Sequence, residues 1–509
     1  MPFKLSLKPL VLFIVFCVTI SALFVGNTVS SFASTGWSTN TNPVASGSLA
    51  CSTSPASVAS ARTGETLTLV GTGSSPCSLN LYRSSDGLNT FSSPQVLATA
   101  TQIRDQSLTV LNNGTIFALW QENTGVGNAT ILRQSHSSDN GVTWSSPNTI
   151  STAGNFSYNA RFPAVAPYGA QGVALSWTQF DGTNERIMTR FSLNLAQWTQ
   201  SQAVSPSGTN GVTSVIATND QNAIAIAWQT IDGNGKLTVS VASSTNWNST
   251  RLVVTTNPLT SSPSQQLTTL SNGSFALTYF DATNAGASTH QVFTRTSSDA
   301  GATWSSALAI SGNLNSQING LSVTKTQNNS IVAAWGAGTT SWAIIQSAQG
   351  NATNTTWSSP TTVMPQGSLP YALGKIAANT DGSVMMIFRL VGVTPPDSIF
   401  TSISSNNGST WSTPSQLATY VRGFPAQSLT ITPLVATGYG VSWNQEGSPS
   451  FTQFVRSYDW SAPVNPPAPA PTPYLPATGF SHLGWLLFVG GLLIAVGAVS
   501  LRLTQKKIQ

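Results

Sequence analysis

Residues 137–144 read S-S-D-N-G-V-T-W, and closely similar segments occur at 297–304 (S-S-D-A-G-A-T-W) and 404–411 (S-S-N-N-G-S-T-W). A looser copy, S-S-D-G-L-N-T-F, occupies 84–91, and weaker echoes end at Trp198, Trp247, Trp357 and Trp460. The aromatic residues that end these segments recur about every fifty residues along the chain. Such regular spacing between weakly similar segments indicates that most of the chain is one repeated structural unit.

The residue types of these segments suit a tight turn followed by an anchoring side chain. Gly supplies positive φ, the Ser and Asp oxygens can accept backbone N–H groups, and Trp can cover the apolar gap between neighbouring sheets. We therefore expect structural staples rather than catalytic sites. The recurring positions in the three fullest copies are Ser137, Asp139, Gly141, Thr143, Trp144, Ser297, Asp299, Gly301, Thr303, Trp304, Ser404, Asn406, Gly408, Thr410 and Trp411.

Each unit also contains short runs with the period of a β-strand. An apolar run that ends in an aromatic residue lies about thirty residues before each motif, and an alternating run such as K-L-T-V-S-V-A-S at 236–243 stands between that apolar run and the motif. Outside the two ends of the chain no window shows helical periodicity. Four short antiparallel strands in each repeat predict an all-β propeller of four-stranded blades. The aromatic residues that end the apolar runs include Trp120, Trp177, Trp228, Tyr279, Trp335 and Trp443.

The S-x-D-x-G-x-T-W segments resemble the Asp-boxes of the sialidase-like propeller superfamily. The resemblance covers roughly residues 37–460, although Asn406 replaces Asp in one box and the copy at 84–91 has its glycine displaced to Gly87. Asp-boxes imply the fold but little about activity, because the superfamily also includes many non-enzymes.

Counting the aromatic residues predicts eight blades, with seven as the main alternative. The segment around Trp37, T-G-W-S-T-N-T-N-P-V-A-S, resembles the tail of a box plus an outer strand. We expect it to close the final blade, because prolines follow Trp460 and would truncate that blade's own outer strand. Closure by both ends of the chain would remove the open sheet edge.

Composition places the propeller body, residues 34–460, outside the cell. Only 7% of the chain is charged, but 40% is hydrophobic and Trp occurs 15 times, which favours a folded protein over a disordered one. Cys51 and Cys77 remain once the leading segment is removed, and an oxidising exterior would join them in a disulfide. Two buried thiols are the alternative.

The basic pI of about 9.2 does not indicate nucleic-acid binding. The chain has 20 basic and 15 acidic side chains, and five of the basic ones lie in its two ends. The body between those ends is therefore neutral. The five terminal basic residues are Lys4, Lys8, Arg502, Lys506 and Lys507.

The first 33 residues have the layout of a secretory signal peptide. Lys4 and Lys8 precede an apolar run at 10–25, and small residues surround an expected cleavage point after Ala33. A retained membrane anchor is the alternative interpretation. Lipidation at Cys17 is not expected, because the preceding Phe16 is bulky.

The C-terminal end combines a spacer, a short motif, an apolar run and a basic tail. Residues 461–474 are proline-rich and predict an extended stalk. L-P-A-T-G follows at 475–479, and an apolar stretch at about 480–501 is long enough to span a bilayer as a helix. The motif residues are Leu475, Pro476, Ala477, Thr478 and Gly479.

This order, within 475–509, resembles the sorting signal that sortases of Gram-positive bacteria recognise. The resemblance implies attack of a sortase cysteine on the Thr478 carbonyl and transfer of the chain to cell-wall peptidoglycan. The apolar helix would hold the chain in the membrane before sorting, with the basic tail in the cytoplasm. A plain membrane-tethered protein is the alternative.

The resemblance places a ligand site on the face opposite the boxes. Candidates on the segments that lead into each blade are Arg104, Asp105, Arg161 and Arg422. A sialidase needs three arginines to clamp the substrate carboxylate, because the guanidinium fork binds carboxylate bidentately. It also needs a Tyr nucleophile assisted by Glu, and an acidic proton donor. Candidates in turns after the aromatic-ended runs are Glu122, Asp181, Asp232, Asp281, Arg389 and Glu446.

Other features weaken the expectation of a sialidase centre. No F/Y-R-I-P segment stands near the N-terminus, and R-F-P at Arg161 and R-G-F-P at Arg422 are partial echoes. Tyr420, beside Arg422, is the only suggestive tyrosine, and spacing pairs no Tyr with a Glu. These polar residues could equally be ordinary solvated loop positions.

Metal and cofactor chemistry are not expected. His136, His290 and His482 are scattered, and no zinc-binding, nucleophile-elbow or phosphate-cradling motif occurs. The leading hypothesis is a wall-anchored binding or adhesion module for glycans or surface proteins. An exo-acting glycoside hydrolase of sialidase type is the first alternative, and a purely structural wall protein is the second.

Overall fold

The computed structural model describes residues 36–38, 42–48, 51, 54, 56–123, 129–151, 160–231, 237–244, 247, 252–255, 265–282, 290–314, 317–338, 343–367, 371–390, 397–420, 429–435, 438–447 and 450–459. The predicted signal peptide, proline-rich linker and sorting signal lie outside these residues. Within the described ranges, no helix has the length and apolar character needed to cross a membrane.

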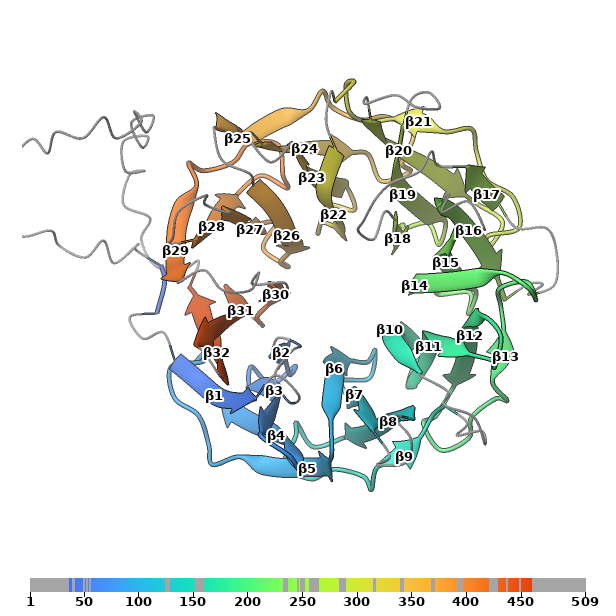
Figure 1. Cartoon of the computed structure of the whole chain (residues 1–509). Helices are drawn as coiled ribbons and strands as arrows, with labels where there is room; N and C mark the ends of the chain where they lie inside the picture. Colours follow the sequence, from blue (N-terminus) through green and yellow to red (C-terminus); the bar gives the residue numbers. More distant parts are fainter. Residues whose placement is uncertain are drawn as a thin grey trace, which may run out of the picture. The chain divides into compact units, whose positions relative to one another are not determined.

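The described residues form thirty-two short strands, arranged around a ring in units of four (Figure 1). The first two units are β2 (Ser57–Ser60), β3 (Thr66–Gly73), β4 (Cys77–Ser84), β5 (Gln95–Ala100), and β6 (Ile103–Val110), β7 (Ile116–Asn123), β8 (Thr130–Ser137), β9 (Asn148–Thr149). The next two are β10 (Arg161–Tyr168), β11 (Gly172–Phe180), β12 (Glu185–Ser192), β13 (Gln202–Ala203), and β14 (Asn210–Thr218), β15 (Ile224–Ile231), β16 (Leu237–Ser243), β17 (Leu252–Thr255).

The second half of the ring repeats this arrangement. It holds β18 (Gln265–Thr269), β19 (Phe275–Ala282), β20 (His290–Ser297), β21 (Leu308–Ala309), then β22 (Gln317–Lys325), β23 (Ile331–Gly338), β24 (Ala343–Gly350), β25 (Thr361–Gly367). The last two units are β26 (Tyr371–Ala378), β27 (Val384–Leu390), β28 (Asp397–Ser404), β29 (Ser415–Tyr420), and β30 (Thr430–Pro433), β31 (Tyr439–Gly447), β32 (Ser450–Tyr458) with β1 (Asn42–Ser48).

The predicted all-β propeller of four-stranded blades is confirmed, but its sheet count is seven rather than eight. Six sheets have four strands, and the seventh has eight, in the order β30-β31-β32-β1-β3-β4-β5 with β2 paired to β3. The expectation of eight separate blades is wrong because the first and last four-stranded units share this sheet. A parallel bridge between Gly47 and Gly73 joins them, where neither residue has a Cβ to keep the backbones apart.

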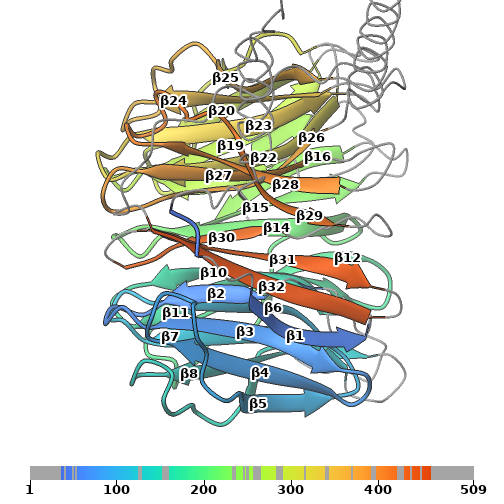
Figure 2. The ribbon, with the colours of Figure 1, turned by 90° about the vertical axis from the view of Figure 1, so that its left-hand side faces the viewer.

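The N-terminal segment closes the ring, as its sequence predicts. Strand β1 pairs antiparallel with β32, and Figure 2 shows the two side by side. Trp37 forms an antiparallel bridge with Tyr458, and their rings meet edge-on with centroids 5.0 Å apart. On the inner edge, the Thr432 hydroxyl donates to the Val58 carbonyl of β2 over 2.9 Å. The ring therefore has no open edge at its seam.

The core lies between neighbouring units. The second strand of each unit is buried on both faces, and Trp120, Trp177, Trp228, Trp335 and Trp443 have at most 1% of their surface exposed. Burying rings of this size contributes a large share of the apolar stabilisation. The apolar runs ending in aromatic residues are therefore central strands, which explains why they lack polar alternation.

The box at 137–144 closes its turn with its own side chains. Asp139 Oδ1 accepts the Thr143 backbone N–H (2.9 Å), and its Oδ2 accepts the Thr143 hydroxyl (2.6 Å). The Gly141 N–H donates to Ser137 Oγ (2.8 Å), and Trp144 Nε1 donates to the Gly141 carbonyl (3.2 Å). Trp144 packs onto the apolar cluster that lies between its own unit and the preceding one. The box thus staples two units together, as expected from its residues.

The looser box at 84–91 keeps this geometry with Leu88 instead of glycine at the fifth position of the box. Two consecutive residues take positive φ in each full box, and here they are Gly87 (φ 68°) and Leu88 (φ 73°). Leu88 is fully buried against Val58 and Val70, so packing offsets the cost of its left-handed backbone. The displaced glycine therefore occupies the first of the two left-handed positions.

Candidate functional site

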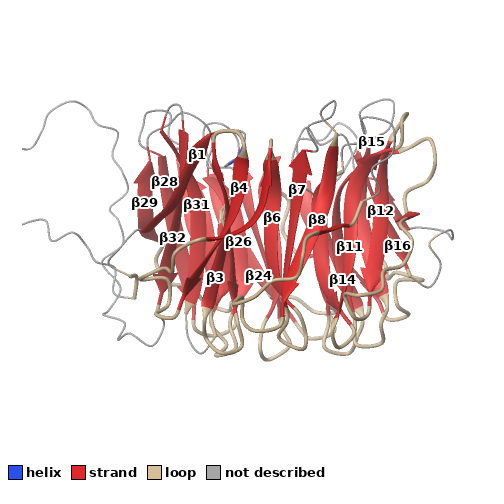
Figure 3. Cartoon of the chain, turned by 90° about the horizontal axis from the view of Figure 1, so that it is seen from below, coloured by secondary structure: helices blue, strands red, loops and turns tan. Residues whose placement is uncertain are grey.

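The antiparallel order of strands gives the propeller two distinct rims. One rim carries two kinds of turn: those between the first and second strands of each unit, and those between the third and fourth strands, which include the boxes. We call this rim the box rim. The first, innermost strand of each unit begins at the opposite rim, which we call the start rim. Figure 3 shows the strands running between the two rims. Asn112, Asn219 and Asn379 fasten the box rim by donating to the Gly169, Gly273 and Gly438 carbonyls of the next units.

At the start rim, several innermost strands carry a β-bulge. The register shifts between Arg104 and Ser107 in β6, and between Arg161 and Ala164 in β10. Inside these bulges Asp105 has φ 51° and Phe162 has φ 53°. Positive φ is unfavourable for residues with a Cβ, and a bulge re-aims the side chain it contains. The bulges thus turn the side chains of Asp105 and Phe162 out of the regular alternation of their strands.

Asp105 bonds two neighbouring segments at this point. Its N–H donates to Ser54 Oγ (2.8 Å), and its Oδ2 accepts the Phe162 N–H (3.3 Å) from the next unit. Burial raises the pKa of the Asp105 carboxyl, against the lowering effect of the Phe162 N–H, the Ser54 hydroxyl and the Arg104 charge. Asp105 therefore holds the Phe162 bulge in place.

Phe162 is exposed beside an ion pair. Its side chain is 45% exposed, and the Arg161 guanidinium carbon lies 5.3 Å from its ring centroid. Arg161 donates to Glu185 Oε1 over 2.7 Å, at the first residue of β12. Burial raises the pKa of Glu185, and the Arg161 charge opposes that rise. We call Arg104, Asp105, Arg161, Phe162 and Glu185 the Phe162 patch.

The patch retains unused hydrogen-bonding atoms. Arg104 Nε, Arg161 Nε and Glu185 Oε2 are buried and have no hydrogen-bond partner in the structure. Buried polar atoms normally have partners, and atoms that lack them are unusual enough to require an explanation. The side chains that carry these atoms are partly exposed beside the Phe162 ring, and together they form a surface that can recognise a polar ligand with one apolar face.

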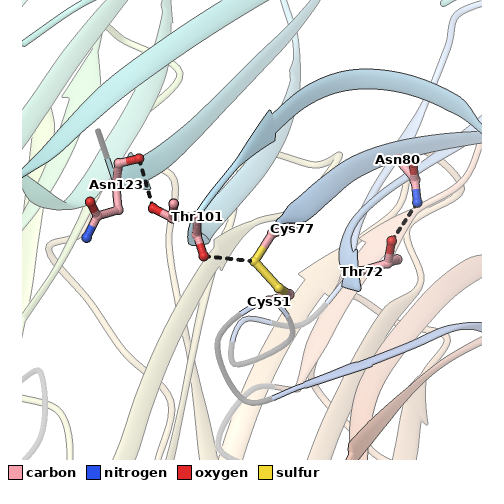
Figure 4. Close-up of a disulfide and its surroundings, with 6 residues drawn as sticks. All are labelled: Cys51, Thr72, Cys77, Asn80, Thr101 and Asn123. Atoms are coloured by element: carbon pink, nitrogen blue, oxygen red, sulfur yellow. Dashed lines mark hydrogen bonds between the residues drawn. A yellow bond between two sulfur atoms is a disulfide. The ribbon is translucent and has the colours of Figure 1, made fainter. Parts of the chain in front are cut away.

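A disulfide lies close in sequence to Ser54, the residue that bonds Asp105 of the patch. Cys51 and Cys77 are joined, with Cα atoms 5.4 Å apart (Figure 4). The Cys77 sulfur lies 3.6 Å from the Thr101 carbonyl oxygen, just before β6. Three residues after Cys51, the Ser54 carbonyl accepts from Gln106 and Gln453. The disulfide thus anchors a segment that bonds β6 and β32 together.

Of the sequence candidates, Arg104, Asp105 and Arg161 come together in the patch. Glu122 instead accepts from Trp120 Nε1 (3.1 Å) and Arg133 Nε (2.8 Å), which is a structural role. Asp181 closes a turn by accepting the Asn184 N–H (2.8 Å) and pairs with Arg186. Asp281 lies in β19, in another sheet.

The remaining candidates do not join the patch. Arg389 lies in β27, and Tyr420 ends β29 of the same sheet, a different one from those of β6 and β10. Glu446 lies in β31, and the side chains of Tyr420 and Glu446 lie outside the described part of the structure. Arg422 and Asp232 lie outside the described residues entirely. The described residues therefore bring together two arginines, not three.

Three tyrosines with described side chains form hydrogen bonds within the fold. Tyr168 donates to the Asn222 carbonyl (3.2 Å), the Tyr279 oxygen accepts from Arg295, and Tyr439 bonds the Ser383 hydroxyl. None of these partners is a glutamate. Among the described residues, no group of three or more His, Cys, Asp and Glu side chains could hold a metal ion.

Sequence reasoning missed Phe162, Glu185 and Ser54 as parts of the site. Phe162 follows a recognised arginine, but an aromatic residue in R-F-P would ordinarily be placed in the core. Glu185 begins a third strand, and its approach to Arg161 depends on how that strand pairs. Ser54 carried no local signal.

No protein-family model matches this chain, and no curated protein matches it in sequence. Solved structures resemble it in fold. A protein of unknown function from Dyadobacter fermentans is 14% identical, with a TM-score of 0.38 over 59% of this chain and 95% of its own. The NanB sialidase of Streptococcus pneumoniae is 12% identical, with a TM-score of 0.37 over 71% and 69%. A lectin from Burkholderia pseudomallei is 12% identical, with a TM-score of 0.42 over 72% and 100%. These likenesses concern the propeller fold alone.

Proposed function

We propose that this chain is a binding module that recognises saccharides at the Phe162 patch. The observation that carries the proposal is Phe162 itself, an aromatic residue held 45% exposed in a left-handed backbone. Such strain costs on the order of 1–2 kcal/mol and concentrates at functional sites. The equivalent bulges at Asp105, Thr213 and Gly320 also take positive φ, so what distinguishes Phe162 is the exposed aromatic ring that its bulge presents.

The chemistry of the patch suits a sugar ring. One face of a pyranose presents C–H groups, which pack against the electron-rich face of an aromatic ring. Hydroxyl groups at the edge of that sugar can accept from the partly exposed guanidinium groups of Arg104 and Arg161 and donate to the partly exposed Glu185 carboxylate. Because Glu185 already holds the Arg161 guanidinium, the polar groups are preorganised, which reduces the entropy lost on binding.

A glycan array with matched variants tests the proposal. Phe162→Gly removes the ring but adopts positive φ freely, so the bulge is preserved. We expect Phe162→Gly to lose binding, Phe162→Tyr to retain it, and Leu193→Ala, which alters another exposed apolar side chain, to leave it unchanged. Wild-type binding by Phe162→Gly to the same glycans would refute the assignment of the site.

A glycoside hydrolase of sialidase type is the second candidate. One observation favours it: Asp105 and Glu185, in one patch, both have pKa values raised by burial, as an acid catalyst requires. The patch holds two arginines, and the Tyr–Glu pair of a sialidase is not among its residues. Turnover of a fluorogenic sialoside that disappears in Glu185→Gln and Arg161→Ala would establish the enzyme. No turnover, with glycan retention, would leave the binding module. A structural wall protein would do neither.

We also propose that the propeller is exported and attached to the cell wall through residues 475–479. Support comes from the order of signal peptide, proline-rich spacer, L-P-A-T-G, apolar run and basic tail. The Cys51–Cys77 disulfide adds support, because such bonds persist in oxidising compartments. Deleting 475–479 should shift the protein from the fraction released by muramidase to the membrane fraction. An unchanged wall fraction would contradict anchoring through this motif.

A further inference from the structure

The innermost strands surround the axis of the ring (Figure 1), and we call the space that their partly exposed residues face the channel. Figure 1 places β2, β6, β10, β14, β18, β22, β26 and β30 around the central opening. Residues in the middle of these strands keep partial exposure, whereas the adjoining second strands are fully buried. Ser107, Val215 and Gln266 are examples, each from a different unit. Water therefore reaches the inner wall well below the rims.

The wall is made mainly of small neutral side chains, and its charge is unbalanced. Among the described residues of the eight innermost strands, the basic residues are Arg104, Arg161, Lys325 and Lys375, and the acid is Asp105. Arg161 is paired with Glu185, and the Arg104 charge acts on Asp105. Lys325 and Lys375 are exposed and make no ion pair within the described residues. These two lysines are the uncompensated charges of the wall.

Lys375 lies inside the channel rather than on an outer surface. It sits in the middle of β26, beside the Gly374 bulge, and its side chain is exposed. Burial nevertheless lowers the pKa of its ammonium group, because protein surrounds it while water reaches it. An exposed side chain on the innermost strand β26 faces the space that the ring encloses (Figure 1). Positive charges on the wall of a confined space concentrate the electric field there and attract anions.

The two lysines are spaced along the channel axis. The Ile376 N–H donates to Ser322 Oγ of the neighbouring strand β22, which places Lys375 level with Leu321 and Ser322. Lys325 lies three residues further along β22, at its box-rim end. At about 3.3 Å per residue, the two levels differ by roughly 10 Å. An extended chain bearing several anionic groups can contact both ammonium groups at their separate levels.

We infer that the central channel binds an extended polyanion through Lys375 and Lys325. The ligand is defined by its chemistry, a linear chain of closely spaced phosphate, sulfate or carboxylate groups. Its binding would be strongest at low ionic strength, because it replaces the counter-ions of both partners. This inference does not depend on saccharide binding at the Phe162 patch, since neither lysine belongs to that patch.

Calorimetric titration of the purified protein with linear inorganic polyphosphate tests the inference. We expect Lys375→Gln to weaken binding about tenfold, as loss of one charge-assisted contact does, and Lys375→Arg to retain it. Lys325→Gln should have a similar effect. Arg83→Gln, which removes a charge paired with Glu65 outside the channel, should leave the affinity unchanged. The Phe162→Gly variant should also bind normally, which separates this site from the saccharide site.

Amine acylation read by mass spectrometry gives a second, independent measurement. Among the residues the structure describes, Lys325 and Lys375 are the lysines, so modified peptides can be assigned directly. Polyphosphate should protect both from acylation, and inorganic phosphate at the same total phosphate concentration should not. Equal affinity for phosphate and polyphosphate, or unaltered polyphosphate binding by a folded Lys375→Gln, would overturn the inference.

Discussion

Gly141→Ala should destabilise the propeller more than its backbone angle alone explains. Gly141 has φ 82°, and a Cβ at this position would lie 2.2 Å from Leu67 Cδ2 in the preceding unit. Leu67 is fully buried in the cluster that Trp144 covers, so it has little room to move. The substitution therefore disturbs both the turn and the contact between two units.

The loss of stability has two parts, the left-handed backbone angle and the contact with Leu67, and each can be estimated. A left-handed backbone costs an alanine about 1–2 kcal/mol relative to glycine. Forcing a methyl group into a packed interface costs roughly a further 1–3 kcal/mol. We expect a total loss of about 2–5 kcal/mol in the free energy of unfolding.

A matched control isolates the packing cost. Gly208 has a similar φ of 78°, but a Cβ there would meet nothing within 4 Å. Gly208→Ala should therefore lose only about 1–2 kcal/mol, the backbone share. Urea unfolding followed by tryptophan fluorescence measures both variants, because the box and central-strand tryptophans report the packing between units.

A double-mutant cycle with Leu67→Ala completes the test. Shortening Leu67 removes the atom that the new Cβ would meet, so Gly141→Ala should cost less in that background. Equal losses for Gly141→Ala and Gly208→Ala, or strict additivity with Leu67→Ala, would refute the proposed clash between units.

Three further predictions follow from the same structure. Cys77→Ser should lower the free energy of unfolding by about 3 kcal/mol, because the disulfide closes a loop over a sequence separation of 26; reduction of wild type should match it, and a variant with unchanged stability would contradict this. Hydrogen bonds from the Thr143 hydroxyl and N–H and from the Ser137 hydroxyl lower the pKa of Asp139 from 3.8 to about 2. The stabilisation of the folded state by the Asp139 carboxylate is therefore complete above pH 3.8 and is lost as the pH falls through 2. Unfolding midpoints of Asp139→Asn and wild type should therefore converge between those pH values, and a constant difference would count against the box bonds. Asn379→Ala should cost about 1–3 kcal/mol by removing the buried hydrogen bonds that its Nδ2 donates to the Leu434 and Gly438 carbonyls, whereas Asn112→Ala, at an exposed equivalent, should cost less in the same unfolding assay.

The candidate site could be predicted only in part. Arg104, Asp105 and Arg161 were recognisable because charged residues at the starts of innermost strands share one rim whatever the details of packing. The contact between Asp105 and Phe162 was not, because it joins residues 57 positions apart through two bulges. Bulges carry no reliable local signal, since they depend on how neighbouring strands pair. Glu185 and Ser54 were missed for the same reason.

The sequence by itself determined the repeat, the four strands of each unit, the box turns and the closing role of the Trp37 segment. These features depend on residues close together in the chain, where turn chemistry and hydrophobic period act directly. Tertiary structure alone decided that the first and last units share one sheet, through Gly47 and Gly73. It alone placed Lys375 on the wall of a channel and Phe162 beside Glu185. Those outcomes depend on ring closure, which brings together residues from different units that no local pattern relates.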